Sequence, residues 1–298
     1  MKRKNKIKKY DEVSFNTIGY ALVIFCAIAA VLPFYILVIG SFTPEEQFYA
    51  EGLSLWPKEF VTDAYDYIFK SPRKILNGYK VTIFITGVGT VMSLFLTSMC
   101  AYALNRKEYR TRNKISFYIY FTSLFSAGLV PSYILFTQFL HLKNNIWVLI
   151  LPAMLSSWNI IMMRNFVQSI PDSIAESGRV DGANEFTIFI RLYLPLMKSG
   201  LACIGLMTAL AYWNNWNLAM IYIEDETLYP LQYLLYQMTA SANYLANAVS
   251  ETDLPTINLP TQSLKLAMAI VTIGPIAVVY PFVQKHFIKG ITVGSVKG

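Results

Sequence analysis

A short polar segment carries the most distinctive arrangement of side chains in this chain. Residues 170–196 interleave closely spaced charges with apolar side chains, and this density of charge is not tolerated in a segment that crosses lipid. The charged residues are Asp172, Glu176, Arg179, Asp181, Glu185 and Arg191, and the apolar ones include Ile174, Val180, Phe186 and Phe189. A water-exposed segment of this mixed kind is suited to docking on another protein, so its chemistry is that of an interface.

Turn and capping residues divide this segment into two short helices. Ser169 is expected to cap a first helix that begins at Pro171. The dipeptide Asp181-Gly182 is expected to end that helix, because glycine commonly follows the last helical turn. Asn184 is expected to cap a second helix, which Pro195 stops.

The rest of the chain has the composition of a membrane protein. It is 55% hydrophobic and 14% charged, with a mean hydropathy of +0.42, whereas soluble domains carry about 25% charged residues. Six stretches are long enough to cross a hydrocarbon core. They are Ile18–Gly40, Val81–Leu104, Ile115–Leu140, Ile146–Met163, Gly200–Ile223 and Leu264–Val283, with a kink expected at Pro152. The first follows a basic start but is too long for a signal peptide and lacks a cleavage site.

Basic residues set the expected orientation. Six, five, four and three Lys or Arg lie in segments 1–17, 105–114, 164–199 and 284–298, against seven in the rest of the chain. Since cytoplasmic segments are enriched in Lys and Arg, both termini are expected in the cytoplasm. We therefore divide the chain into a cytoplasmic tail (1–17), one six-span domain (18–283) that contains a cytoplasmic loop at 164–199, and a second tail (284–298).

Several kinds of chemistry are not supported by the sequence. The dipeptide Gly-Lys does not occur, so no phosphate-binding loop of the P-loop type is present, and Gly87-Val-Gly89 is better explained by helix packing. His141 and His286 are expected at opposite membrane faces, and no metal-ligand spacing or catalytic set is found. Because the positive charge is spread over four segments that flank spans, nucleic-acid binding is not expected.

The loop resembles the EAA loop of bacterial ABC-importer permeases. The resemblance rests on Pro171, Ile174, Glu176, Val180, Asp181-Gly182-Ala183 and Leu194-Pro195-Leu196, with Ser177 and Gly178 where the family usually has two alanines. Six spans, a cytoplasmic N-terminus and a loop between spans four and five agree with the family. The resemblance implies an all-α, polytopic six-helix transmembrane domain in the plasma membrane of a bacterium, with Glu176, Ser177, Gly178, Asp181, Gly182 and Ala183 in ATPase coupling.

The same resemblance implies an assembly and a substrate class. Phe186 and Phe189 in the loop, with the run Tyr212-Trp-Asn-Asn-Trp-Asn217, are similar to carbohydrate-importer permeases of the maltose type. Asp181-Gly-Ala-Asn-Glu-Phe186 and Tyr229-Pro-Leu-Gln232 resemble the branch that carries oligosaccharides and polysaccharide fragments. Such a permease pairs with a second homologous permease, two cytoplasmic ATPase subunits that dock on 170–195, and an extracellular sugar-binding lipoprotein. This chain would bind no cofactor and catalyse no reaction, since Mg-ATP belongs to the ATPase subunits.

Candidate substrate contacts lie late in the fifth expected span. Trp213, Asn214, Trp216 and Asn217 offer amides and flat rings, which suit the hydroxylated edges and C–H faces of a sugar. Amides that faced lipid would be costly, although they could equally tie helices together or mark the membrane interface. An ABC permease for a non-sugar substrate remains an alternative. An ion-coupled secondary transporter would require intramembrane carboxylates or inverted repeats, and the sequence shows neither.

Overall fold

The chain is helical throughout the part that the structure describes. A computed structural model describes residues 2–52, 54–125, 127–252 and 261–295, and none of these residues lies in a β-strand. Three helical segments are long and apolar enough to cross a membrane, namely Phe15–Ser41, Pro72–Asn105 and Thr261–Val278. Three further pairs of bent helices bring the number to six if each pair is one span. The prediction of an all-α polytopic membrane protein is confirmed.

The described chain separates into two compact units. The first comprises residues 1–70 and 239–273, and the second comprises 71–238 and 274–298. In the first unit, α1 (Lys2–Ser41) is followed by α2 (Glu45–Glu51) and α3 (Asp63–Phe69). Glu45 of α2 accepts hydrogen bonds from the backbone N–H groups of Gln262 and Ser263 at the start of α14 (Thr261–Ser295), and it thereby satisfies N–H groups that have no partner within the helix.

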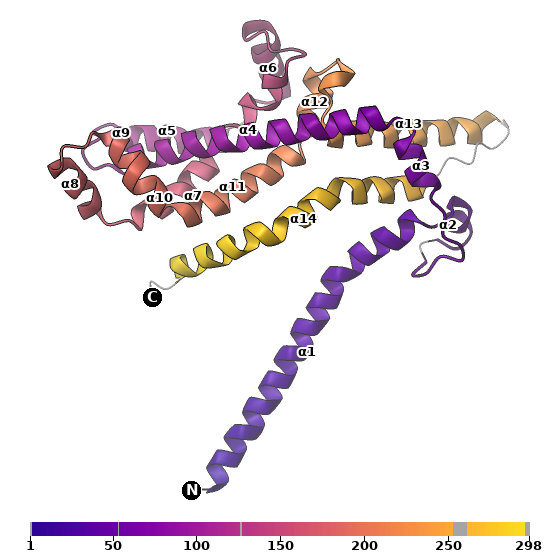
Figure 1. Cartoon of the computed structure of the whole chain (residues 1–298), viewed down its shortest axis with the longest axis horizontal. Helices are drawn as coiled ribbons and strands as arrows, with labels where there is room; N and C mark the ends of the chain where they lie inside the picture. Colours follow the sequence, from indigo (N-terminus) through magenta and orange to yellow (C-terminus); the bar gives the residue numbers. More distant parts are fainter. Residues whose placement is uncertain (1, 53, 126, 253–260, 296–298) are drawn as a thin grey trace. The chain divides into compact units, whose positions relative to one another are not determined.

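The second unit is organised around one long helix, α4 (Pro72–Asn105), which at 1.5 Å per residue is about 50 Å long. Its other elements are α5 (Arg112–Leu124), α6 (Leu129–Ile134), η1 (Leu135–Phe139), η2 (Ile146–Leu149), η3 (Leu151–Ala153), α7 (Ser157–Gln168), α8 (Asp172–Val180), α9 (Glu185–Ile188), η4 (Phe189–Tyr193), α10 (Leu194–Leu196), α11 (Lys198–Trp213), α12 (Asn217–Tyr222), η5 (Glu226–Leu228), the first part of α13 (Leu231–Thr252) and the part of α14 from residue 274 onward. Figure 1 shows α8 and α9 at one end of α4, with α12 and the start of α13 at the other.

Close packing of α4 against α11 holds this unit together. Gly89 of α4 lies directly on the ring of Tyr212, because a Cβ atom added at Gly89 would lie 2.6 Å from that ring. The Tyr212 hydroxyl donates a 2.9 Å hydrogen bond to the carbonyl of Ile150, so the ring also ties η2 and η3 to the helix pair. Gly89 therefore serves helix packing, as the sequence predicts.

Three predicted spans are interrupted. The third bends by 115° between α5 and α6, where Gly128 has a φ of +86°. The fourth bends by 53° between 146–153 and α7, and it begins with 3₁₀ turns around Pro152. The fifth is not one helix from Gly200 to Ile223, because α11 ends at Trp213 and α12 begins only at Asn217. The expectation of a continuous fifth span is wrong at the residues proposed to contact substrate.

Candidate functional sites

The helix α8 presents one face to solvent and packs the other against its own chain. Ser173, Glu176, Ser177 and Val180 are exposed, and their spacing of three and four residues places them on one face. Val180 is 86% exposed. The exposed face therefore combines a carboxylate, two hydroxyls and an apolar side chain.

The opposite face of α8 is buried. Ala175 is 1% exposed, and a Cβ atom added at Gly178 would lie 3.0 Å from Leu192 and 3.1 Å from Ile188. Ala183 packs against the same apolar cluster. Of the six predicted coupling residues, Gly178 and Ala183 thus face inward, whereas Glu176, Ser177, Asp181 and Gly182 are exposed.

The observed ends of the two loop helices agree in part with the ends predicted from the sequence. The N–H of Gly182 bonds to the carbonyl of Arg179, and the N–H of Ala183 bonds to that of Gly178. These two bonds form a Schellman motif, in which Gly182 adopts a φ of +78°. Asn184 caps α9 by accepting a 2.8 Å hydrogen bond from the Thr187 N–H, as predicted. The prediction that Ser169 caps α8 is wrong, because its hydroxyl instead donates to the carbonyl of Phe166 at the end of α7.

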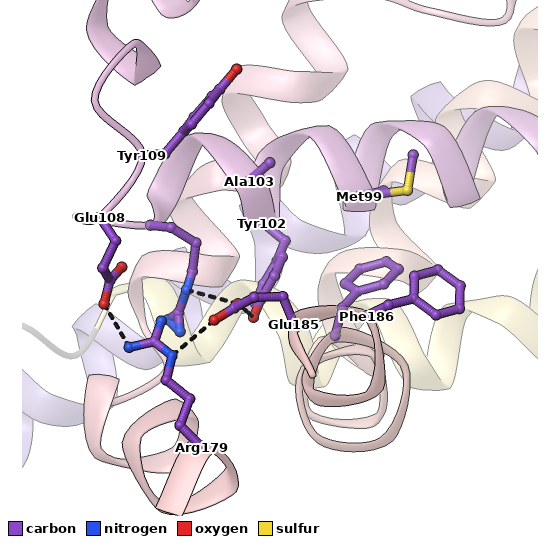
Figure 2. Close-up of a pocket in the computed structure, with 10 residues that line it drawn as sticks. Met99, Tyr102, Ala103, Glu108, Tyr109, Arg179, Glu185 and Phe186 are labelled. Atoms are coloured by element: carbon purple, nitrogen blue, oxygen red, sulfur yellow. Dashed lines mark hydrogen bonds and ion pairs between the residues drawn. The ribbon is translucent and has the colours of Figure 1, made fainter. Parts of the chain in front are cut away.

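A network of charged side chains joins the loop to the C-terminal end of α4. The Tyr102 hydroxyl donates a 2.6 Å hydrogen bond to Glu185 Oε2. Arg179 of α8 donates to Glu185 Oε1 at 2.8 Å and to Glu108 Oε1 at 2.6 Å, as Figure 2 shows. Lys107 pairs with Asp172 at 2.7 Å. Both loop helices are therefore connected to the end of the second span.

Arg106 lies at the centre of this network. Only 8% of the residue is exposed, and its guanidinium carbon lies 5.0 Å from the ring centre of Tyr102 and 5.3 Å from that of Tyr193. Its Nη1 donates to the Tyr193 hydroxyl at 3.3 Å, and its Nε lies 3.7 Å from Glu185 Oε2. Cation–π contacts strengthen when the cation is desolvated, so this guanidinium joins α4, α9 and η4 in one cluster.

The cluster around Arg106 borders a cavity of about 430 Å³. Figure 2 shows the lining residues Met99, Tyr102, Ala103, Glu108, Tyr109, Arg179, Glu185 and Phe186, which Arg106 and Phe189 complete. Its walls are apolar rings and its rim is charged. Phe186, in the second loop helix, is 59% exposed, which places a second apolar side chain on the surface of the loop.

The ion pairs shift the pKa values of the loop carboxylates downward. Burial alone would raise the pKa of Glu185, but hydrogen bonds from Tyr102 and Arg179 outweigh this effect and lower it. A hydrogen bond from Arg179 lowers the pKa of Glu108, and one from Lys107 lowers that of Asp172. All three groups are therefore charged at neutral pH, which maintains the network.

The four predicted substrate contacts lie at and beside the break between α11 and α12. Trp213 is buried and lines a cavity of about 170 Å³ with Thr86 and Leu210, whereas Asn214 and Asn217 are exposed and Trp216 is half-buried. Asn214 Oδ1 accepts a 3.2 Å hydrogen bond from Gln232 Nε2. The break thus brings Asn214, Trp216 and Asn217 towards solvent but turns Trp213 inward.

Sequence reasoning missed several residues that the structure places at these sites. The sequence identifies Arg106 only as one basic residue of segment 105–114, and Glu185 only as one charged residue of the loop. A tyrosine followed by two basic residues at the end of an apolar span, Tyr102, Arg106 and Lys107, was a signal in the sequence for this cluster. Nothing in the sequence shows that Gln232 reaches Asn214.

Comparisons with known proteins assign the class. Residues 89–293 match the family model described as "Binding-protein-dependent transport system inner membrane component". The chain is 37% identical to the polygalacturonan/rhamnogalacturonan transport system permease protein YtcP of Bacillus subtilis, over 95% of this chain and 98% of the relative. It is 29% identical to the arabinooligosaccharides transport system permease protein AraQ of Halalkalibacterium halodurans, over 95% of each chain.

A solved structure agrees with these relatives. A chain from the crystal structure of a bacterial ABC transporter involved in the import of the acidic polysaccharide alginate is 30% identical, with a TM-score of 0.77. The match covers 92% of this chain and 96% of that one. The protein is therefore a membrane permease. It belongs to the family of inner membrane components of binding-protein-dependent transport systems.

Proposed function

We propose that this chain is one of two permease subunits of an ATP-driven importer for an oligosaccharide, most readily one that contains uronic acid. The observation that carries the proposal is the nearly full-length similarity to a permease for polygalacturonan and rhamnogalacturonan. The similarity to an alginate importer supports the same substrate class. The remaining subunits would be a second permease, two ATPase subunits that bind Mg-ATP, and an extracellular sugar-binding lipoprotein.

The loop 164–199 is proposed as the site where an ATPase subunit docks. The exposed face of α8, formed by Ser173, Glu176, Ser177 and Val180, supports this assignment. Asp181 and Gly182 border that face, and Gly178 and Ala183 support it from behind. The charged network around Arg106 and Glu185 holds the loop to α4, so that a movement imposed on the loop would be carried into the second span.

The topology follows from the same assignment. The loop lies at the C-terminal end of α4, so the cytoplasm would be at that end. Both termini would then be cytoplasmic, which agrees with the excess of Lys and Arg on that side. We treat residues 18–283 as one permease domain, with the break at 214–216 near its outer mouth. Asn214, Trp216 and Asn217 would contact sugar there, whereas Trp213 would support the break from within.

Uptake by the reconstituted transporter tests the proposal. The chain would be assembled in vesicles with its partner permease, ATPase and binding lipoprotein, and supplied with galacturonate oligomers of two to six units. ATP-dependent accumulation is expected, and the purified chain alone is expected to hydrolyse no ATP. Transport of amino acids or phosphonates without transport of any oligosaccharide would instead favour an ABC permease of another substrate class.

A further inference from the structure

Three aromatic rings gather where the break between α11 and α12 meets α13. Trp216 and Tyr236 are stacked, with ring centres 4.5 Å apart and an angle of 21° between their planes. Tyr233 lies nearly parallel to Tyr236, at 6.4 Å and 17°. These three residues, here called the aromatic cluster, come from two segments that are separate in the sequence.

Amide side chains surround the aromatic cluster. Gln232 of α13 donates a hydrogen bond to Asn214 at the break. Gln237 Nε2 donates a 3.0 Å hydrogen bond to the Tyr233 hydroxyl. Tyr236 is 45% exposed, Asn214 is exposed and Gln232 is half-buried. Ring surface and amide groups are thus accessible to solvent at one place, and both are fixed by contacts between the two segments.

The backbone at the break indicates that this place meets water. Asn215 Oδ1 accepts a hydrogen bond from the N–H of Leu218 in the first turn of α12. Non-helical backbone within a membrane is tolerated only where it is buried in protein or lines a water-filled cavity. Asn214 and Asn217 on either side of the break are exposed on this chain, so a water-filled path beside the break would satisfy this condition.

An interfacial tyrosine belt does not account for this arrangement. Belt residues anchor a helix singly at the headgroup level, and they need neither a stacked partner from another segment nor an amide pair beside them. A sugar ring requires both features, because its C–H face packs on an aromatic ring while its hydroxyls need donors and acceptors. Binding sites for small molecules combine apolar ring surface with a few placed polar groups in this way.

We propose that Asn214, Trp216, Gln232 and Tyr236 form one subsite that binds a single pyranose ring of the incoming oligosaccharide. The inference rests on the proposed function and adds to it the first turns of α13. Gln232 and Tyr236 are thereby assigned to substrate contact. Tyr233 lies nearly parallel to Tyr236, and Gln237 holds the Tyr233 hydroxyl.

Substitutions at Tyr236 and Gln232 test this subsite in the complete transporter. With the galacturonate oligomers as probe, Tyr236→Ala and Gln232→Ala are each expected to raise the KM for uptake about tenfold relative to the unmodified transporter. Tyr236→Phe keeps the ring and is expected to stay within about twofold of the unmodified transporter. Rates are normalised to the amount of assembled complex.

Tyr244→Ala is the matched control. Tyr244 is on the same helix as Tyr236 and is 74% exposed. If both tyrosines only anchored the helix at the membrane interface, Tyr244→Ala and Tyr236→Ala would have equal effects on uptake. Equal effects of Tyr236→Ala and Tyr244→Ala, or an unchanged KM in both Tyr236→Ala and Gln232→Ala, would overturn the subsite while the proposed function stands. If Tyr236→Ala does not assemble, Gln232→Ala alone decides. Failure of the unmodified transporter to import any oligosaccharide would overturn the proposed function and the subsite with it.

Discussion

The hydroxyl of Tyr102, near the end of α4, donates a 2.6 Å hydrogen bond to the carboxylate of Glu185 at the start of α9. The two residues are 83 positions apart in the sequence. Their contact joins a predicted span to the loop proposed for ATPase docking, and Arg106 and Arg179 share the same carboxylate. The loop is therefore attached to the second span by side-chain contacts. Its backbone continues separately into the fifth span.

Loss of this contact is expected to weaken coupling. Tyr102→Phe removes one hydrogen bond to a charged acceptor, which contributes roughly 1.5–3 kcal/mol, so the loop should move more freely relative to α4. We expect several-fold less sugar transported per ATP hydrolysed, measured in vesicles with the assembled transporter. Tyr109→Phe, in the wall of the same cavity, is the control and should leave the ratio unchanged. An unchanged ratio in Tyr102→Phe would show that the contact does not serve coupling.

Charge reversal on the exposed face of α8 tests the docking surface. Glu176→Lys places a longer, oppositely charged side chain on that face, so binding of the ATPase subunit should be lost while the chain still inserts in the membrane. Co-purification of the ATPase and sugar uptake are the two measurements. Glu59→Lys reverses an exposed charge in the first unit and should change neither. Normal co-purification and uptake with Glu176→Lys would contradict the docking assignment.

Two glycines of the loop are expected to respond differently to alanine. Gly182 has a φ of +78°, so Gly182→Ala strains the end of α8 and should lower stability by roughly 1 kcal/mol. Gly178→Ala should be nearly neutral, because the gain in helix propensity offsets small shifts of the Ile188 and Leu192 side-chain ends. Thermal unfolding of the two variants in detergent compares them directly. A larger loss for Gly178→Ala would contradict the packing described.

The loop network is expected to weaken in acid. The pKa values of Glu108, Asp172 and Glu185 are lowered by their partners, so the stability they contribute is present above the ordinary carboxyl pKa values. It is lost as the pH falls through the lowered ones. Hydrogen exchange of 172–188, corrected for its intrinsic pH dependence, should be flat from about pH 6 to 9 and rise below about pH 4.5. Residues 231–238, held by amide and hydroxyl contacts, should show no such rise.

Local patterns in the sequence were sufficient for the helical class, for the apolar segments long enough to cross a membrane, and for the roles of Gly182 and Asn184 at the ends of the loop helices. Hydrophobic length decides whether a segment suits a bilayer, and Gly182 and Asn184 act through bonds to residues within five positions. These determinants are short in range, so they can be read without a fold. The same holds for the resemblance of the loop to a known family.

The tertiary structure alone decided which side chains meet. Arg106 becomes a buried centre only because α4, α9 and η4 converge on it, and Gln232 reaches Asn214 only because α13 returns to the break. The break at 214–216 could not be placed either, since asparagines there mark a polar stretch but asparagine by itself does not end a helix. Contacts between distant segments depend on how helices pack, and packing depends on the shapes of many side chains together, which no local pattern of residues contains.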